Sequence, residues 1–191
     1  MDWRVVPMVV VTAGGPGRRL RELLRTGGAL SMLCADTDRA AFSGDGPDIV
    51  FISQRAFYQI ACENAAFIVR RKGELPQEFS CKNAVAIIDS ADPAVLSAVA
   101  GRRLPAVTCG LGTSDTLTLS SLTVDSAVIS LQRQITAFDG TQVEPFELPV
   151  SFSGKLEPFE LLAAAAIFCL MGKQNPLAAA PLWRIPPGPR P

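Results

Sequence analysis

The sequence lacks histidine entirely, with none among its 191 residues. Histidine is the commonest general base in enzymes, the commonest metal ligand and the side chain whose charge changes near neutral pH. Serine hydrolase triads and cysteine–histidine nucleophile pairs are therefore excluded in their usual forms. A single absence thus removes several classes of catalytic and metal site.

The sequence also lacks a basic excess and a long apolar run. Lysine plus arginine number 18, equal to aspartate plus glutamate, so the formal net charge is zero. A nucleic-acid-binding protein normally carries excess positive charge, and we expect no nucleic-acid partner. The apolar segment 161–171 is far shorter than the roughly 20 residues that a membrane span needs, and residues 7–11 are too short an apolar run for a signal peptide. We expect a cytoplasmic protein without a membrane partner, and zero net charge favours self-association or a protein partner.

No Cys-x-x-Cys motif occurs, although the chain has five cysteines. Their number is odd, their spacing is wide and most lie in apolar segments, which argues against a zinc site. We expect buried, reduced thiols, as is usual in the cytoplasm. The residues are Cys34, Cys62, Cys81, Cys109 and Cys169.

The hydrophobic fraction of 48% suits one compact globular domain, which we assign to residues 1–174. Residues 175–191 are rich in proline and show little periodicity. They form a tail that is extended or disordered unless its apolar side chains dock on the domain. The alternative is that residues 181–186 present a short linear motif to a partner, with Trp183 and Arg184 as the candidate interaction residues.

The first half of the chain alternates strand and helix patterns. Residues 5–12 are a continuous apolar run rich in β-branched residues, typical of a strand buried on both faces of a parallel sheet. A glycine-rich turn separates this strand from Leu20, Leu23 and Leu24, which recur at helical spacing. Further strands are predicted at residues 29–34, 49–52, 84–88 and 106–109, a loop at 36–46, and helices at 56–69 and 94–100.

Two of these helices carry signals at their ends. Asp92 is a natural N-cap, and Pro93 suits the first turn of the helix at 94–100. The basic cluster at residues 70–72 suits the C-terminal end of the helix at 56–69.

The pattern changes in the second half. Polar-alternating segments with turn residues between them, including Asp139 and Gly140, predict an antiparallel β-meander. A helix at 158–171, capped by Gly172, closes the chain's folded part. This order predicts an α/β fold: a three-layer α/β/α domain with a mainly parallel, P-loop-type sheet and a small antiparallel β-meander. The meander strands are residues 116–123, 127–136 and 143–152.

Four short segments, in the right order, resemble the central nucleotide-binding domain of the Mur ligases, the peptidoglycan amino-acid ligases. Residues 85–93 (VAIIDSADP) resemble the family's strand ending in Asn-x-Asp-Asp-Pro. Residues 104–111 (LPAVTCGL) resemble its strand followed by Phe/Tyr-Gly-Leu. Residues 150–154 (VSFSG) and 161–166 (LLAAAA) resemble its helix entry, Pro-Gly-x-His-Asn-x-x-Asn-Ala-Leu-Ala-Ala. The resemblance covers residues 5–172 and implies this fold and an ancestry among ATP-dependent amide ligases.

Residues 14–19 (GGPGRR) lie where the family has its P-loop, Gly-Thr-x-Gly-Lys-Thr/Ser. The position at the first strand–helix junction is where a parallel sheet presents a helix N-terminus to phosphate. The resemblance therefore implies a phosphate-binding site, and its candidate residues are Gly14, Gly15, Gly17, Arg18 and Arg19.

The loop departs from the family in its two chemical groups. A P-loop lysine reaches the β- and γ-phosphates, and a Ser/Thr hydroxyl binds Mg²⁺. Here Arg18 stands in place of the lysine and Arg19 in place of the hydroxyl. Arginine lacks the compact reach of lysine, and Arg19 cannot ligate a cation. We therefore expect no catalytic residue, no metal site and no ATP or Mg²⁺ cofactor.

Other family residues have no counterpart. The segment between the P-loop position and the strand at 49–52 is too short for the family's magnesium-binding glutamate. Leu156, Glu157 and Glu160 stand where the family has His-Asn…Asn near the adenine. By spacing alone, Lys72 matches a lysine that is carbamylated in many members of the family. The family's N-terminal substrate domain and C-terminal amino-acid domain are expected to be absent.

Three functional hypotheses follow. The first is a non-catalytic Mur-ligase-like module with a structural or protein-interaction role. The second is an ATP-dependent ligase-type enzyme, or a half-enzyme completed by a partner chain, in which Arg18 replaces the lysine and Asp89, Asp92 or the partner holds the metal. The third is a binder of a phosphate-containing ligand through residues 14–19.

Two smaller alternatives remain open. Asp89 and Asp92 are either metal ligands or structural residues, at a strand end and a helix N-cap respectively. The arginines around residue 20 are either a docking face for an acidic partner or the solvated face of a helix. These arginines are Arg18, Arg19, Arg21 and Arg25.

Overall fold

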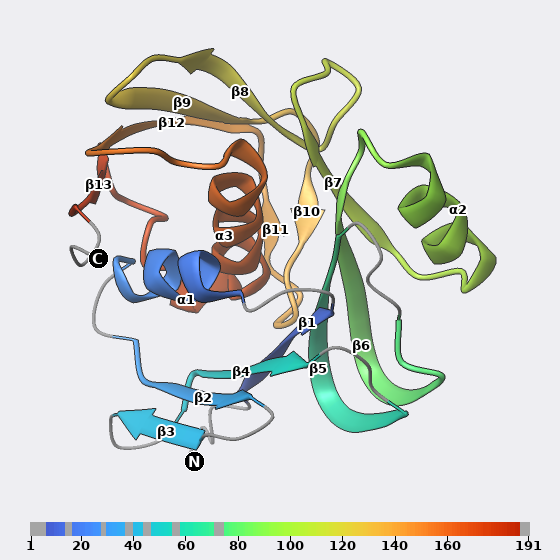
Figure 1. The fold of residues 1–191 in the computed structure, drawn as a ribbon. Helices are drawn as coiled ribbons and strands as arrows, with labels where there is room; N and C mark the ends of the chain where they lie inside the picture. The colour runs from blue at the N-terminus through green and yellow to red at the C-terminus, as the bar shows by residue number, and fades with distance from the viewer. Residues whose placement is uncertain are drawn as a thin grey trace. The chain divides into compact units, whose positions relative to one another are not determined.

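The structure is a computed structural model that describes residues 7–13, 17–27, 30–36, 40–43, 47–54, 58–70 and 75–187 (Figure 1). Its contacts divide the chain into two compact units. The first unit comprises Met1–Gly17, Ala29–Ile88 and Asp92–Ala106. The second comprises Arg18–Gly28, Asp89–Ala91 and Val107–Pro191.

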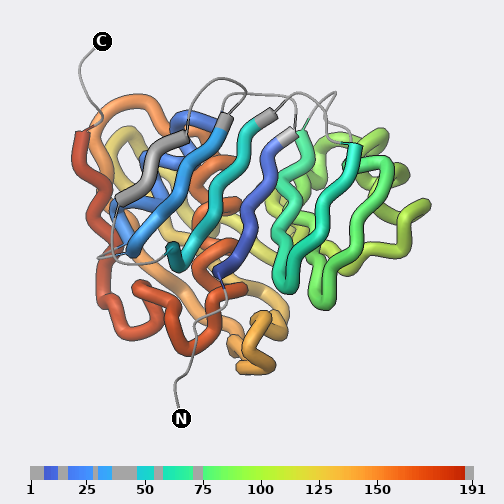
Figure 2. The backbone as a smooth tube through the Cα atoms, turned by 90° about the horizontal axis from the view of Figure 1, so that it is seen from below, coloured from blue at the N-terminus to red at the C-terminus, as the bar shows by residue number. Residues whose placement is uncertain are grey.

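The first unit is built on a mainly parallel sheet whose strands lie side by side in Figure 2. The strand order is β6-β5-β1-β4-β2-β3, and among the described residues only the pairing of β3 with β2 is antiparallel. In the central strand, Val10 and Val11 point to opposite faces and are 0% and 2% exposed, which confirms the predicted strand buried on both faces. The strands are β1 (Met8–Ala13), β2 (Met32–Asp36), β3 (Ala40–Ser43), β4 (Ile49–Gln54), β5 (Gln59–Val69) and β6 (Glu78–Asp89).

The helix predicted at residues 56–69 is wrong, because β5 occupies Gln59–Val69. This strand pairs in parallel with β1 on one side and β6 on the other. Its last five residues, 65–69, are all buried, since neighbouring side chains enter opposite faces of the sheet. A strand buried on both faces has no alternation, so its apolar run matched helical spacing by chance. The basic cluster at 70–72 therefore ends no helix, and Arg71 and Lys72 lie outside the described residues.

The loop predicted at residues 36–46 is also partly wrong. Ala40–Ser43 form β3, which pairs antiparallel with β2 from Met32↔Ser43 to Ala35↔Ala40. A four-residue strand is too short for its hydrophobic pattern to show a period. Its extended conformation is determined by pairing with β2.

One helix, α2 (Pro93–Gly101), belongs to the first unit, and its start confirms the predicted cap. Asp92 Oδ1 accepts hydrogen bonds from the N–H groups of Ala94 at 3.1 Å and Val95 at 3.4 Å, and Pro93 occupies the first turn. Val95 and Val99 pack into the apolar core formed on β1, β5 and β6.

The second unit combines a β-meander with two helices. Its strand order is β13-β12-β9-β8-β7, and β8, β9 and β12 pair antiparallel, which confirms the predicted meander. Two short strands, β10 (Ile135–Thr136) and β11 (Gln142–Val143), form a separate hairpin. The others are β7 (Ala106–Gly110), β8 (Leu117–Leu122), β9 (Ser126–Leu131), β12 (Phe146–Phe152) and β13 (Trp183–Ile185).

Helix α3 (Pro158–Leu170) is the core of the second unit, and every residue from Leu161 to Leu170 is buried. Helix α1 (Arg18–Arg25) packs on α3 and buries the three predicted leucines. Gly27 lies against Phe168 so closely that a Cβ there would collide with its ring. A short 3₁₀ turn, η1 (Gly172–Gln174), follows α3.

Gly172 ends α3 as predicted, at φ +60°. This left-handed conformation is one that glycine adopts without steric cost. The side chain of Asp139 lies against its α-carbon, and a Cβ there would collide with the carboxylate.

These two units together give the predicted fold class, α/β with mainly parallel strands and a small antiparallel addition. Among the described residues, no helix is long and apolar enough to cross a membrane.

Candidate functional site

The glycine-rich loop is only partly visible, because Gly14, Gly15 and Pro16 lie outside the described residues. Gly17 follows at φ +51°, and a Cβ there would lie 2.9 Å from Phe51 Cζ and 3.1 Å from Thr12 Oγ1. Both the backbone conformation and the close approach therefore require glycine at this position.

Thr12, at the end of β1, presents a hydroxyl beside Gly17. The side chain is 5% exposed, and Oγ1 has no hydrogen-bond partner in the described part of the chain. A buried hydroxyl without a partner costs about 1–3 kcal/mol. It marks a place beside the predicted loop where a ligand oxygen or a water would satisfy a protein group.

Arg18 and Arg19 open helix α1 in the second unit, and both contact the same carboxylate. Arg18 Nε donates to Glu22 Oε1 at 3.1 Å, and Arg19 Nη1 donates to Glu22 Oε2 at 3.2 Å. The Arg18 side chain is 68% exposed, whereas that of Arg19 is 23% exposed. Arg19 Nε is buried without a hydrogen-bond partner among the described residues. The single negative charge of Glu22 therefore offsets half of the positive charge of the two arginines that the sequence assigned to phosphate binding.

The two aspartates proposed as alternative metal ligands have local structural partners. Asp92 caps α2 as described above. Asp89 Oδ1 accepts a hydrogen bond from the N–H of Ala91 at 3.0 Å, at the end of β6. Within the part of the chain that the structure describes, no group of three or more Cys, Asp or Glu side chains is placed to hold a metal ion.

The turn after β7 contains a buried carboxylate that sequence reasoning missed. Asp115 is 3% exposed, and its Oδ2 accepts a hydrogen bond from the N–H of Gly112 at 3.0 Å. Gly110 lies so close to Ser90 Oγ and to this carboxylate that no side chain fits there. Asp115 therefore determines the conformation of the segment Gly110-Leu111-Gly112. The two glycines were the feature of the sequence from which this turn could have been predicted.

Cys109, which precedes that turn, is fully buried. Burial raises the pKa of its thiol well above the ordinary value, and the carboxylate of Asp115 adds to the effect. A thiolate is the nucleophilic form of cysteine, so burial makes Cys109 a poor nucleophile.

The start of α3 is where the resemblance implies an adenine site. Glu157 occupies the N-cap position without a side-chain capping hydrogen bond, and Pro158 follows in the first turn. Glu160 lies in the first turn as well, so this helix N-terminus carries carboxylates. Carboxylates there interact favourably with the helix dipole and would repel a phosphate-bearing ligand.

The proline-rich tail docks on the second unit through β13, as far as Ile185. Trp183 is 1% exposed, and β13 pairs in parallel with β12. Trp183 Nε1 donates to Thr26 Oγ1 at 2.9 Å, and its ring meets Phe168 edge-on at a centroid distance of 5.5 Å. Of the two predicted alternatives, the structure therefore shows docking. Arg184, the other candidate interaction residue, is exposed.

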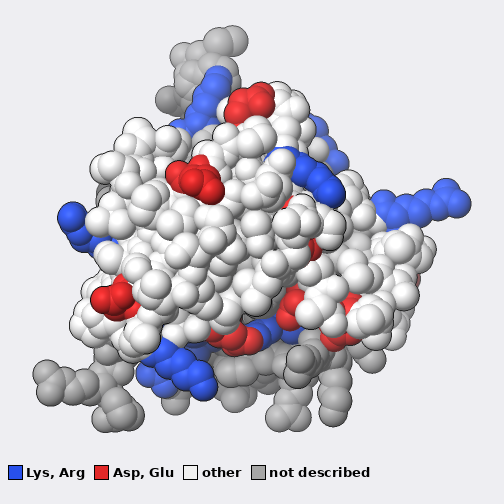
Figure 3. Space-filling view, turned by 90° about the horizontal axis from the view of Figure 1, so that it is seen from above, with Lys and Arg blue, Asp and Glu red and all other residues white. Residues whose placement is uncertain are grey.

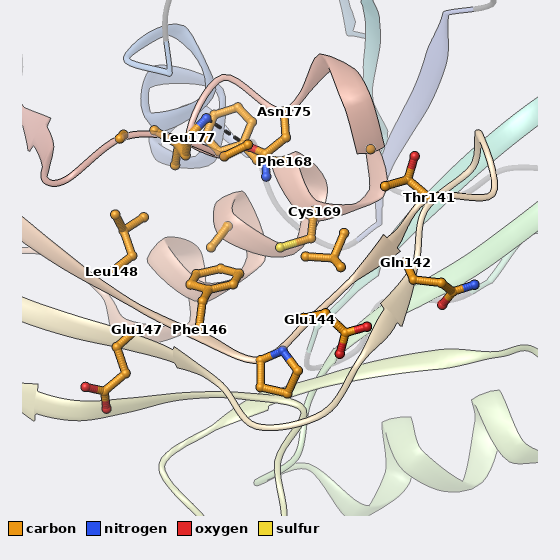
Figure 4. A pocket seen from close by; sticks show the side chains of 16 residues that line it. Thr141, Gln142, Glu144, Phe146, Glu147, Leu148, Phe168, Cys169, Asn175 and Leu177 are labelled. Atoms are coloured by element: carbon orange, nitrogen blue, oxygen red, sulfur yellow. Dashed lines mark hydrogen bonds between the residues drawn. The ribbon is translucent and has the colours of Figure 1, made fainter.

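A cavity of about 410 Å³ lies in the second unit, where sequence reasoning predicted nothing (Figure 4). Its floor is the side of α3 that carries Ala165, Phe168 and Cys169, and its walls are residues 141–148 and 175–180. Figure 4 shows Phe146 beneath α3 near Cys169, whereas the carboxylate of Glu147 points away. Residues from three separate segments form this cavity, so no local pattern in the sequence indicates it.

Charged side chains are dispersed on the face shown in Figure 3. Over most of this face wide neutral areas separate the charged side chains, and near its lower edge acidic and basic side chains lie next to one another. This face therefore offers no continuous basic track among the described residues.

No family model matches the sequence, and no curated protein matches it. Solved structures do match. A UDP-N-acetylmuramoylalanyl-D-glutamyl-2,6-diaminopimelate–D-alanyl-D-alanyl ligase from Acinetobacter baumannii aligns at 12% identity and TM-score 0.55, over 93% of this chain and 46% of that one. A crystal structure of MurF from Acinetobacter baumannii aligns at 11% identity and TM-score 0.53, with the same coverage of both chains.

A third structure, a UDP-N-acetylmuramoyl-L-alanyl-D-glutamate–2,6-diaminopimelate ligase, aligns at 13% identity and TM-score 0.52, again over 93% of this chain and 46% of that one. The chain thus spans about half the length of these ligases. At such low identity the likeness concerns the fold: this chain has a Mur-ligase-like α/β fold.

Proposed function

We propose that this chain is a non-catalytic Mur-ligase-like module with a structural or protein-interaction role. The observation that carries the proposal is the pairing of Arg18 and Arg19 with Glu22. The two residues at the positions of the P-loop lysine and hydroxyl contact a carboxylate of their own helix. Neither side chain can take over the Mg²⁺-binding role of the hydroxyl, because a guanidinium is a donor only.

The remaining parts of the resemblance support the same proposal. Asp89 and Asp92 serve local hydrogen bonds, and the start of α3 presents Glu157 and Glu160. Loss of individual electrostatic groups from phosphoryl-transfer sites costs orders of magnitude in rate. The proposal places the module in the cytoplasm, with a protein partner or a second copy of itself.

Calorimetric titration with ATP and Mg²⁺ tests the proposal. We expect no binding at micromolar concentrations by the purified chain. Micromolar binding that is lost in Arg18→Ala would overturn the proposal and favour the ATP-dependent ligase or half-enzyme. ATP hydrolysis that depends on Arg18, alone or with a partner chain, would do the same.

The Glu22→Gln variant sharpens this test. It keeps the size and hydrogen-bonding capacity of the side chain but removes the charge that offsets Arg18 and Arg19. If Glu22 suppresses anion binding, this variant should bind inorganic phosphate more tightly than the unmodified chain does. The matched control is Glu63→Gln, an exposed glutamate on β5, which should have no effect.

A second candidate function is binding of a phosphate-containing ligand without a metal. The unpartnered Thr12 hydroxyl beside Gly17 favours it, because a phosphate oxygen is a suitable acceptor. Titration with inorganic phosphate, followed through the amide signal of Gly17, tests this function. A shift that disappears in Thr12→Val would support it, and an unresponsive amide would exclude it.

A further inference from the structure

Two partly exposed cysteines lie side by side in the first unit. Cys62 on β5 and Cys81 on β6 are register partners, and their Sγ atoms are 3.5 Å apart. The pairing is fixed on both sides. Ala61 pairs with Ser80 before the cysteines, and after them Asn83 Nδ2 donates to Asn64 Oδ1 at 2.8 Å. The sheet therefore holds the two sulfurs as neighbours.

The other three cysteines differ from this pair in burial. Cys34, Cys109 and Cys169 are 5%, 0% and 1% exposed, whereas Cys62 and Cys81 are of intermediate exposure. The expectation of buried thiols thus holds for three of the five. A reagent in solution has access to Cys62 and Cys81 before it reaches the others.

We propose that Cys62 and Cys81 form a reversible disulfide site, oxidised by small-molecule disulfides. Neighbouring strands lie about 4.8 Å apart, within the Cα separation of roughly 4.4–6.8 Å that disulfides span. The sulfurs must approach by about 1.5 Å to reach the bond length of about 2.05 Å. Rotation of the two side chains supplies this movement without a change of register.

The exchange balances with one molecule of oxidant. The thiolate of one cysteine of the pair attacks a small-molecule disulfide, forms a mixed disulfide and releases one thiolate. The other cysteine then loses its proton and attacks the sulfur of the first, forming the Cys62–Cys81 bond and expelling the second thiolate. Two protein thiols are oxidised and one external disulfide is reduced to two thiols.

The surroundings of Cys62 disfavour its thiolate form. Burial raises the pKa of Cys62 to about 12, and its hydrogen bond with Cys81 and the charge of that neighbour add to the rise. A raised pKa slows the reaction of Cys62, and the 3.5 Å separation of the two sulfurs favours the second step once the mixed disulfide has formed.

Peptide mapping tests the site directly. Each of the five cysteines falls in a separate tryptic peptide, with Cys62 in residues 56–70 and Cys81 in residues 73–82. The native chain is incubated with oxidised glutathione, alkylated, digested without reduction and analysed by mass spectrometry. We expect the linked pair 56–70/73–82, which dithiothreitol separates, as the main product.

The variants separate the two steps. Cys62→Ser should accumulate glutathione on Cys81, and Cys81→Ser should accumulate it on Cys62, since in each variant nothing resolves the mixed disulfide. Three results in the unmodified chain would overturn the proposal: no reaction, glutathione on Cys81 without the link, or links to Cys34, Cys109 or Cys169 in equal yield. A guanidinium-unfolded sample, which should give mixed links, shows that the oxidant is active.

Discussion

Replacement of Trp183 by alanine should destabilise the second unit by about 3–5 kcal/mol, the usual cost of truncating a buried aromatic residue. Trp183 is 1% exposed, and a tryptophan of this burial removes about 150–250 Å² from water. At about 25 cal/mol per Å², that area is worth roughly 4–6 kcal/mol, part of which the alanine retains. The edge-on contact with Phe168 contributes about 0.5–1.5 kcal/mol beyond this area.

The hydrogen bond of Trp183 can be separated from its packing. Thr26 Oγ1 accepts from Trp183 Nε1 and donates to the carbonyl of Leu23 at 2.7 Å. Trp183→Phe leaves the donor bond of Thr26 in place, so the loss of the indole N–H should cost only about 1 kcal/mol plus the lost ring area. A double-mutant cycle with Thr26→Val should give a coupling of about 0.5–1.5 kcal/mol.

Urea unfolding followed by circular dichroism measures these changes, and hydrogen exchange of the β12 amides locates them. The Arg184→Ala variant is the matched control, since Arg184 is the exposed neighbour in the same strand and should change stability by less than about 0.5 kcal/mol. A loss of less than about 1 kcal/mol in Trp183→Ala would refute the inference that the tail is a docked part of the fold.

Two further predictions concern the end of α3. Gly172→Ala should lower the melting temperature more than Gly140→Ala does. Both glycines have positive φ, but a Cβ at Gly172 would meet the Asp139 carboxylate, whereas the space at Gly140 is open. Equal shifts of the melting temperature would contradict this prediction. Asp139 should also make stability depend on pH. Desolvation raises the pKa of its carboxyl, but hydrogen bonds from Lys173 and Thr141 and the charge of Lys173 outweigh it, so the pKa lies below the ordinary 3.8. A lowered folded pKa means that this stabilisation is complete above about pH 5 and is lost as pH falls through the folded pKa. Urea unfolding at pH 3 and pH 6 should therefore show a larger difference for the unmodified chain than for Asp139→Asn.

The elements that sequence analysis predicted correctly carry their own local signals. Asp92 and Pro93 mark the start of α2, and alternation of polar and apolar residues marks the meander. Leu20, Leu23 and Leu24 mark the buried side of α1. In each case the residues that the element requires lie within a few positions of one another in the sequence.

The elements that were missed depend on distant partners. The apolar residues of β5 are compatible with either a helix or a buried strand, and pairing with β1 and β6 decides between them. The docking of Trp183 depends on Thr26, which lies 157 residues away in the chain. The cavity beside α3 needs three segments to be brought together.

The candidate loop falls between these two cases. Its glycines and arginines are visible in the sequence, and so is Glu22, three and four residues beyond Arg19 and Arg18. That spacing places opposite charges on one helix face, so the pairing was available as a prediction. The unpartnered hydroxyl of Thr12 could not be predicted in this way, because it results from the burial of β1 on both faces.

The complete burial of α3 has a consequence for how the helix is oriented about its own axis. Most surface helices are oriented by polarity, since one side is charged and turns toward water. From Leu161 to Leu170 every side is apolar, so polarity distinguishes no direction. The size of the side chains is what distinguishes one direction from another. Four consecutive alanines allow close approach around one turn, and bulky Phe168 fills the space beside Gly27 and Trp183. The rotation of α3 is thus specified by volume, and a substitution that conserves hydrophobicity but exchanges large for small would turn the helix toward a different packing.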